Sequence, residues 1–377
     1  MKKTKILFLV NVDWFFISHR LPIAIEAAAR GYEVHVATTV TNRAKEIQGY
    51  GFILHEISIS RGDTSLFTSL RTFFSIIKLF KFIKPHIVHL VTIKPILLGG
   101  IAARLTNTPG VIAAISGLGY IFINQGLMAS FRRFFIKRLY RLSLGHKNIK
   151  IICQNRNDLQ EIKTIAKLSD NDFVIISGSG VSLHKYKYIP DTRETPNVIM
   201  ASRLLIDKGV QEFYDAAVML KKMKLAANFI LVGDTDRDNP SSISTDLITQ
   251  WKQAGIIDFW GHRENMHDVL PQASIVVLPS YREGFPKVLI EAAACGRAVV
   301  TTDVPGCRDA IYNKVTGILV PAQDAGALAR AIETLILNTG DRNKMGLKAR
   351  EMAEERFDEK IVIDEHFRLY NEISNNM

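Results

Sequence analysis

Short runs of apolar residues alternate with longer stretches of helical periodicity along the chain. Runs of this length between polar or glycine-containing segments are typical of buried parallel strands. In the first half they are residues 5–10, 33–38, 86–91, 111–116 and 149–154, and in the second half residues 197–202, 228–233, 257–261, 274–280, 298–303 and 317–320. Helical patterns such as residues 21–31 lie between them. The alternation predicts an α/β fold with two Rossmann-like, doubly wound domains facing across a cleft.

The length of the chain supports this division. A chain of 377 residues is long for one domain, and two domains of about 150–200 residues each are the default expectation. The segment 183–196 is polar and contains two prolines, which is typical of a boundary. We therefore expect an N-terminal domain over residues 1–182 and a C-terminal domain over 183–357, with a last helix near 358–377 packing back on the first.

Membrane spans, secretion signals and zinc knuckles are not indicated. The apolar run Ile6–Val10 is five residues long, whereas a secretory signal needs about seven or more. The longest uncharged span, residues 105–131, is interrupted by polar residues and glycines, so it does not read as a membrane helix. Cys153, Cys295 and Cys307 are odd in number and lack a CxxC spacing, which favours a reduced, cytoplasmic compartment.

The first half of the chain is rich in basic residues. The net charge of the chain is +11, and the interval between Asp63 and Asp158 has no acidic residue but 14 Lys and Arg. Within it, residues 69–84 and 130–142 mix bases with aromatics at helical spacing. These segments are either core-packing helices whose bases reach out to solvent, or a surface that docks on anionic lipid headgroups. Nucleic acid is a weaker third interpretation, because no binding motif is visible.

Two stretches of the second half indicate a phosphate ligand. In "ASRLLIDKGV", Arg203 and Lys208 follow the end of a predicted strand, where two cations can converge on a diphosphate. Two solvated charges at a helix start are the alternative interpretation. A nicotinamide cofactor is not indicated, because the GxG sequences at 117–119 and 178–180 do not complete GxGxxG.

The stretch "EGFPKVLIE" places two carboxylates at a fixed distance. Pro286 suits the first turn of a helix and Gly296 suits its end. Glu283 is then in the loop, and Glu291 is about five residues, or roughly 7.5 Å, into the helix. Between them lie backbone N–H groups at a helix N-terminus, which favour an anion. A diphosphate with hydroxyl-rich groups at both ends describes a nucleotide-sugar.

With these residues in view, the chain resembles retaining glycosyltransferases of the GT-B fold, of the family numbered four. The E-x7-E of Glu283 and Glu291, "SRLLIDKG", "LVGD", "LPSYREGFP" and "EAAACGRAVVTTDVPG" match its pattern in order. "HRLPIAIEAAARGYEVHV", "TIKP" and "SGLGYIF" in the first half resemble bacterial members that extend polyprenyl-diphosphate-linked sugars, such as the N-acetylgalactosaminyl- and galactosyltransferases of O-antigen and N-glycan assembly.

The resemblance implies roles for residues of the second half. Arg203 and Lys208 neutralise the diphosphate leaving group, Glu283 binds hydroxyls of the donor sugar, and Glu291 binds the ribose. The donor-binding residues it implies are Gly284, Phe285, Lys287, Val288 and Glu291. No metal or other cofactor is expected. The donor is a UDP-sugar, N-acetylgalactosamine being the best match, and the sugar is transferred with retained configuration.

For the first half, the resemblance implies an acceptor side. His19 is a candidate for a catalytic histidine, because the chain reads "VHLVTIKP" where many members carry a histidine pair. The acceptor- or membrane-contacting residues are Lys94, Arg132, Arg133, Lys137 and Arg138. The expected partners are a lipid-diphosphate-linked sugar and the anionic inner face of the cytoplasmic membrane, with no nucleic acid. A GT-B-like UDP-sugar 2-epimerase and a non-enzymatic, membrane-docked binding subunit are the alternatives.

Overall fold

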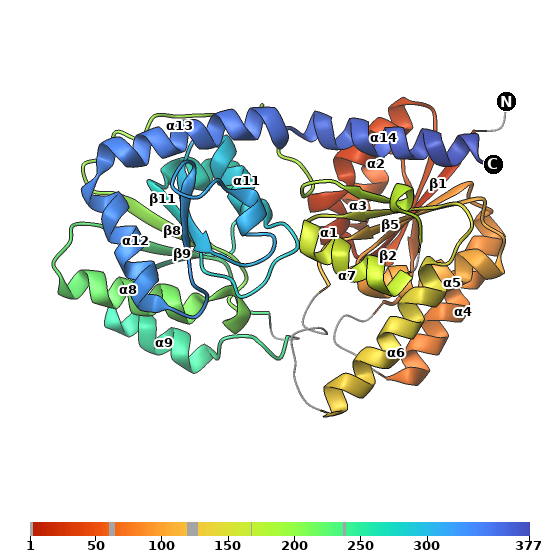
Figure 1. Ribbon diagram of the computed structural model, residues 1–377, viewed down its shortest axis with the longest axis horizontal. Helices are drawn as coiled ribbons and strands as arrows, with labels where there is room; N and C mark the ends of the chain where they lie inside the picture. Colours follow the sequence, from red (N-terminus) through yellow and green to blue (C-terminus); the bar gives the residue numbers. More distant parts are fainter. Residues whose placement is uncertain (1–2, 60–64, 119–126, 167, 237–238) are drawn as a thin grey trace. The chain divides into compact units, whose positions relative to one another are not determined.

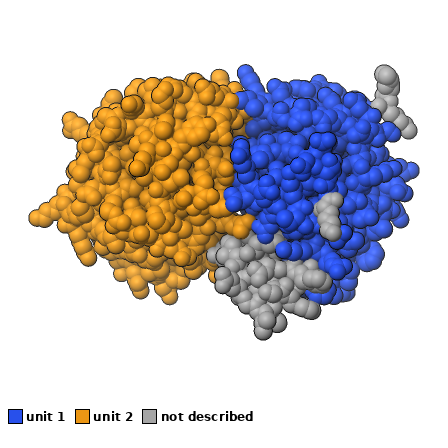
Figure 2. Space-filling view, in the orientation of Figure 1, with its two compact units in different colours: residues 1–179, 360–377 blue, residues 180–359 orange. Residues whose placement is uncertain are grey.

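The computed structural model describes residues 3–59, 65–118, 127–166, 168–236 and 239–377, and only the backbone of residues 127–134. The chain forms two compact units, residues 1–179 with 360–377 and residues 180–359 (Figure 2). The last helix therefore belongs to unit 1. The described residues contain no helix that is long and apolar enough to cross a membrane.

Unit 1 is built on a parallel sheet of seven strands in the order β3-β2-β1-β4-β5-β6-β7 (Figure 1). The strands are β1 (Lys5–Val12), β2 (Glu33–Thr39), β3 (Ile53–Glu56), β4 (Ile87–Val91), β5 (Gly110–Ile115), β6 (Ile149–Cys153) and β7 (Phe173–Ile175). The helices are α1 (Asp13–His19), α2 (Leu21–Ala29), α3 (Ala44–Gly49), α4 (Leu66–Ile83), α5 (Ile93–Leu105), α6 (Leu127–Leu144), α7 (Arg156–Ala166) and α14 (Glu359–Asn375).

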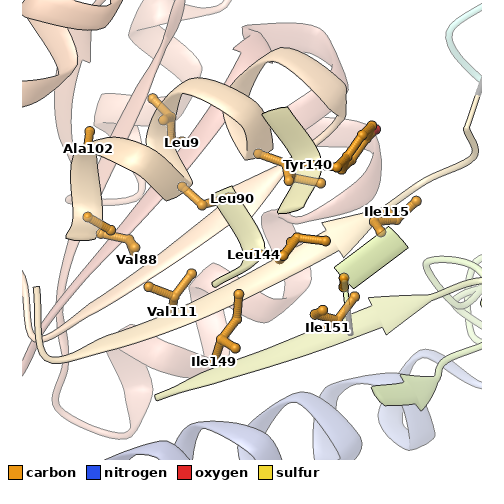
Figure 3. Packing of buried hydrophobic residues seen from close by; sticks show 14 of the residues in the cluster. Leu9, Val88, Leu90, Ala102, Val111, Ile115, Tyr140, Leu144, Ile149 and Ile151 are labelled. Atoms are coloured by element: carbon orange, nitrogen blue, oxygen red, sulfur yellow. The ribbon is translucent and has the colours of Figure 1, made fainter. Parts of the chain in front are cut away.

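Alternate residues of the unit 1 strands supply two cores. Leu7 and Leu9 of β1 face a core shared with α4, α5 and α6, and Ile6, Phe8 and Val10 face a core shared with α1, α2 and α14. Figure 3 shows the first core, where Tyr140 and Leu144 of α6 pack over the strands. Burial on both faces explains why these strands read as continuous apolar runs.

Unit 2 repeats the plan with six parallel strands in the order β10-β9-β8-β11-β12-β13. The strands are β8 (Asn197–Ala201), β9 (Asn228–Val232), β10 (Asp258–Gly261), β11 (Ile275–Leu278), β12 (Ala298–Thr302) and β13 (Gly317–Val320). The helices are α8 (Val210–Lys222), α9 (Thr245–Ala254), α10 (Met266–Val269), α11 (Lys287–Ala294), α12 (Ala325–Leu337) and α13 (Thr339–Arg356). One face packs against α8, α9 and α12, and the other against α10, α11 and α13.

Each predicted strand is present, and the predicted class of two Rossmann-like units is confirmed. The two strands that the pattern did not predict, β3 and β7, are both at sheet edges. In β3 no residue is fully buried, and β7 is three residues long. Their short or half-exposed sequences lack the continuous apolar run by which the other strands were recognised.

Candidate functional site

In both sheets, the direction in which successive strands are added reverses at an equivalent place. In unit 1 the strand order turns between the neighbours β1 and β4, and in unit 2 between β8 and β11. In open α/β sheets, ligands bind outside the carboxyl ends of the strands at such a switch point. The loops 202–209 and 279–286 follow β8 and β11, so the predicted diphosphate residues and the first glutamate lie at the switch point of unit 2.

Backbone contacts hold these two loops together. The Ser280 hydroxyl and the Tyr281 amide both donate to the Asp207 carbonyl, at 3.0 and 2.9 Å. Gly209 has φ +73°, and a Cβ there would lie 2.1 Å from the Pro279 carbonyl oxygen. Only glycine tolerates both the conformation and the close approach. The tight packing brings the side chains of the two loops within bonding distance.

Lys208 and Glu283 form an ion pair across the loops. The Lys208 ammonium lies 2.5 Å from Glu283 Oε1, and the two side chains are 16% and 13% exposed. Arg203 donates to Asp236 Oδ2 at 2.7 Å, and its side chain is 41% exposed. Both predicted diphosphate-binding cations therefore lie beside a carboxylate. The partner Asp236, in the loop after β9, was not among the residues that the sequence singled out for the site.

Glu291 lies in a different environment from Glu283. It is the fifth residue of α11, which begins after Pro286, and it is 5% exposed. The Tyr186 hydroxyl donates to Glu291 Oε1 at 2.6 Å, and the Lys287 ammonium lies 3.5 Å from the same oxygen. Burial and the neighbouring Glu291 charge raise the pKa of Tyr186, so its hydroxyl stays protonated and donates to the carboxylate.

The backbone between the two glutamates is buried and tightly packed. Gly306 has φ +82°, and a Cβ there would lie 2.6 Å from the carbonyl oxygens of Glu283 and Gly284. Phe285 is 7% exposed, and its ring packs edge-on against Phe357 at 5.6 Å. The Phe285 side chain is thus part of the unit 2 core. Any contact of Phe285 with a ligand would therefore come from its backbone. Lys287 and Val288 are half-buried in the first turn of α11.

At the unit 1 switch point the structure has a pocket of about 260 Å³. Its lining residues are Asn11, Phe15, Thr92, Ile93, Lys94, Ser116 and Gly117. They come from the carboxyl end of β1 and from the segments that follow β1, β4 and β5, which are neighbours in the sheet. Lys94, a predicted acceptor residue, is therefore in this lining. The ring of the candidate histidine, His19, stacks on the lining residue Phe15 at 4.0 Å, and His19 itself is not in the lining.

His89 has no place in this site. Its side chain is fully buried, its Nδ1 lies 2.6 Å from the Tyr370 hydroxyl of α14, and its ring stacks on Phe8. Burial, together with the charge of the buried Arg20, holds the pKa of His89 well below its usual value. His89 is a neutral core residue that helps to seat the last helix.

The two basic helices of unit 1 are only partly buried. On α4 the buried positions are Thr72, Ile76, Phe80 and Ile83. Leu66, Phe67, Leu70, Phe74 and Phe82 on α4, and Phe135, Leu139 and Leu142 on α6, are exposed. Both helices lie on the sheet face covered by α5, and each of them packs against α5. The core-packing interpretation accounts for one stripe of each helix and leaves the exposed aromatics unexplained.

Among the bases predicted to contact acceptor or membrane, Lys137 and Arg138 are exposed on α6. Arg132 and Arg133 fall where the side chains lie outside the described part of the chain. Over the described residues, no group of three or more His, Cys, Asp or Glu could hold a metal ion.

Comparison with known proteins identifies the family. Residues 195–338 match the family model described as "Glycosyl transferases group 1", and residues 5–157 match "Glycosyl transferase 4-like". The chain is 30% identical over 383 residues to the N,N′-diacetylbacillosaminyl-diphospho-undecaprenol alpha-1,3-N-acetylgalactosaminyltransferase of Campylobacter jejuni, with 98% of this chain and 99% of the relative covered. The chain belongs to this glycosyltransferase family. It is an enzyme that transfers sugars, and the epimerase and binding-subunit alternatives are set aside.

Further matches agree. The UDP-Gal:alpha-D-GlcNAc-diphosphoundecaprenol alpha-1,3-galactosyltransferase of Escherichia coli is 25% identical over 301 residues, covering 74% of this glycosyltransferase and 75% of the relative. The crystal structure of HepE from Anabaena in complex with UDP superposes with a TM-score of 0.75 at 19% identity, with 97% and 98% of the chains covered. The likeness extends over both units, and the glycosyltransferase has the GT-B fold.

Proposed function

We propose that this glycosyltransferase moves N-acetylgalactosamine, or a related hexose or N-acetylhexosamine, from a UDP-sugar to a polyprenyl-diphosphate-linked saccharide, with retention of configuration. The observation that carries the proposal is the 30% identity along nearly the whole length of a relative that is named for the transfer of N-acetylgalactosamine to a sugar linked to diphospho-undecaprenol. The Escherichia coli relative is named for the same acceptor class, with galactose as its donor sugar. The product belongs to surface-polysaccharide assembly.

The unit 2 switch point supplies the groups that this reaction needs. In the proposed site, Lys208 and Arg203 face the diphosphate of the donor, and Glu283 accepts hydrogen bonds from the hydroxyls of the sugar. Glu291 takes the ribose hydroxyls, one helical turn further along. Charge that develops on a departing phosphate is stabilised best by cations already fixed in place, and the contacts of Lys208 hold it in the loop.

The proposed step is a same-face displacement. The bond between the anomeric carbon and the β-phosphate oxygen breaks, and its electron pair stays on the phosphate. The acceptor hydroxyl forms the new bond to the anomeric carbon, and its proton passes to the phosphate oxygen that has just left. Glu283 is already engaged with Lys208, so we assign it to sugar binding and not to a covalent intermediate of the glycosidase type.

The test is transfer by the purified protein. UDP-GalNAc, UDP-Gal, UDP-Glc and UDP-GlcNAc are each incubated with a short-chain lipid diphosphate that carries one sugar. We expect a disaccharide lipid, with an α-linkage by nuclear magnetic resonance, from UDP-GalNAc first. A β-linked product refutes retention, interconversion of UDP-sugars without a lipid product indicates an epimerase, and the absence of both refutes transfer.

We also propose that unit 1 docks on the anionic inner face of the cytoplasmic membrane through α4 and α6. The support is the exposed aromatic and aliphatic side chains of both helices, interleaved with exposed Arg71, Lys78, Lys81, Arg138 and Arg141. Near an anionic surface each base contributes about 1 kcal/mol, and the contribution decays within a Debye length. A few bases, together with aromatic side chains that insert among the lipid headgroups, can therefore hold the enzyme at its lipid-linked acceptor.

Sedimentation with liposomes tests the docking. Binding is expected to rise with the fraction of anionic lipid, to weaken in salt, and to fall in a Lys78→Gln/Lys81→Gln variant. The matched control is Lys221→Gln/Lys222→Gln, which removes two exposed bases at the end of α8 in unit 2. Equal binding to neutral and anionic vesicles, or equal losses in both variants, contradicts the proposed surface.

A further inference from the structure

The unit 1 pocket has a lining that is mostly apolar, with a few polar groups among it. Phe15 and Ile93 supply apolar surface, while Asn11, Thr92 and Ser116 supply polar atoms from three neighbouring strand ends. Its volume of about 260 Å³ lies just below the roughly 300–1,000 Å³ of sites that enclose whole drug-sized ligands. It is of the right order for one substituted sugar unit.

Thr92 has an unusual backbone conformation at this place. Its φ is +74° and its ψ is 168°, a region that is essentially restricted to glycine and is costly for a β-branched residue. A threonine that precedes a helix normally turns its hydroxyl onto the first amides of that helix. Thr92 precedes α5 and makes no such side-chain cap. The helix therefore does not use this hydroxyl, and backbone strain of this kind is typical of ligand-binding positions.

Three lining residues carry buried oxygen atoms that are not satisfied within the protein. In the part of the chain that the structure describes, Asn11 Oδ1, Thr92 Oγ1 and Ser116 Oγ are buried and have no hydrogen-bond partner. A buried polar atom without a partner is costly, and native proteins contain few of them. Three around one pocket mark a site that is complete only when a polar ligand occupies it.

The chemistry of the three oxygens defines the ligand. We infer that this pocket binds the N-acetyl group of the acceptor sugar, with the amide N–H donating to Asn11, the amide oxygen accepting from Thr92 and Ser116, and the methyl group against Phe15 and Ile93. This inference rests on the proposed function. It identifies residues by which the enzyme selects an acetylated amino sugar as its acceptor. Both relatives named above have such a sugar in their acceptors.

A phosphate group satisfies this lining less well. The N-terminus of α5 and the neighbouring Lys94 favour an anion. However, an anionic phosphate has no hydrogen to donate, so Asn11 Oδ1 remains unsatisfied. The apolar surfaces of Phe15 and Ile93 also gain nothing from a phosphate oxygen. An amide with a methyl group satisfies every member of the set.

The experiment compares two acceptors that differ only at C2. One short-chain lipid diphosphate carries N-acetylglucosamine and the other carries glucose, and UDP-GalNAc is the donor for both. The variants are Ser116→Ala and Thr92→Val, which remove one hydroxyl each. The control is Thr249→Val, which removes an exposed hydroxyl of α9 in unit 2 that is bonded to the Thr245 carbonyl. Circular dichroism verifies folding, and Ser116→Ala serves alone if Thr92→Val unfolds.

We expect wild type to use the N-acetylated acceptor at least about tenfold better in kcat/KM. Each hydroxyl removed should reduce this preference about threefold to tenfold, through the KM of the acceptor. Thr249→Val should retain the preference, and the choice between UDP-GalNAc and UDP-Gal should not change in any variant. A preference unchanged in both pocket variants, or a change in donor choice instead, overturns the inference.

The two proposals fail in distinguishable ways. If wild type transfers to neither acceptor, the proposed function is wrong, and calorimetric binding of the same two lipids then decides the pocket. Tighter binding of the N-acetylated lipid that is lost in Ser116→Ala supports the inference. Equal binding of both lipids refutes it.

Discussion

Replacing the Lys208–Glu283 pair by neutral side chains separates a structural role from a catalytic one. The variants are Lys208→Met, Glu283→Gln and the double variant. Each single change leaves one partly buried charge without its partner. Breaking a fully buried pair costs about 3–5 kcal/mol, and an exposed pair is worth about 0–1. With side chains 16% and 13% exposed, we expect each single variant to lose about 2–4 kcal/mol of unfolding free energy.

The double variant should behave differently in stability and in activity. Its two neutral side chains leave no orphaned charge, so it should recover much of the stability and show a coupling energy of about 1–3 kcal/mol. Activity should not recover, because the ammonium that faces the departing diphosphate is still absent. All three variants should lose about two to four orders of magnitude in kcat/KM, and the losses should not add.

Urea unfolding and a lipid-acceptor transfer assay on the same preparations measure both quantities. The exposed pair Lys348–Glu351, 2.6 Å apart with both side chains 50% exposed, is the matched control. Lys348→Met/Glu351→Gln should change neither quantity appreciably. A Lys208→Met/Glu283→Gln enzyme with near wild-type turnover would refute the catalytic assignment. The ion pair would then have only a structural role, which is to hold the two loops together.

Three further expectations concern single residues. Glu291→Gln should weaken UDP binding about 10- to 100-fold by calorimetry while leaving sugar discrimination intact, because a charge-assisted bond to the ribose is lost; unchanged UDP affinity removes the ribose role. Burial and the nearby Arg20 charge lower the pKa of His366 to about 3, against about 6.5 in the unfolded chain. As the pH falls, the unfolded state therefore takes up a proton on His366 before the folded state does. Stability should therefore fall by up to about 1.4 kcal/mol per pH unit from His366 as the pH drops from 6.5 towards 3, and thermal melting of His366→Phe should show a shallower fall; parallel curves contradict this. Gly209→Ala should lower the unfolding free energy by at least about 1 kcal/mol, since the new Cβ meets the Pro279 carbonyl at 2.1 Å; an unchanged urea midpoint contradicts the loop argument.

The sequence was informative where a side chain's position follows from its own element. Parallel strands end at one edge of a sheet, so Arg203, Lys208 and Glu283 could be placed at the carboxyl edge of the second sheet from the pattern alone, whereas the switch point there became apparent only from the strand order of the structure. In the same way, the helix start predicted at Pro286 placed Glu291 beyond the first turn of that helix, where the structure has it. Both inferences use only local periodicity and the direction of the strands.

Partners from distant segments could not be found in this way. Asp236 lies 33 residues from Arg203, and Tyr186 lies 105 residues from Glu291, so only the folded chain brings them together. The motif "TIKP" drew attention to residues 92–95, but the sequence could not reveal the positive φ of Thr92 or its unsatisfied hydroxyl. The sequence also left open the role of the basic helices, because periodicity identifies the buried stripe and is silent about what covers the other side.

The position of α14 has a consequence for the order in which the chain can be completed during synthesis. Residues 180–359 are contiguous, so unit 2 has all of its strands before the last helix leaves the ribosome. Unit 1 cannot finish its second core until Phe367, Leu369, Tyr370 and Ile373 arrive, because these side chains fill it. The first unit to be translated is thus the last to complete its core. A chain that terminates about twenty residues early leaves one apolar face of the unit 1 sheet exposed.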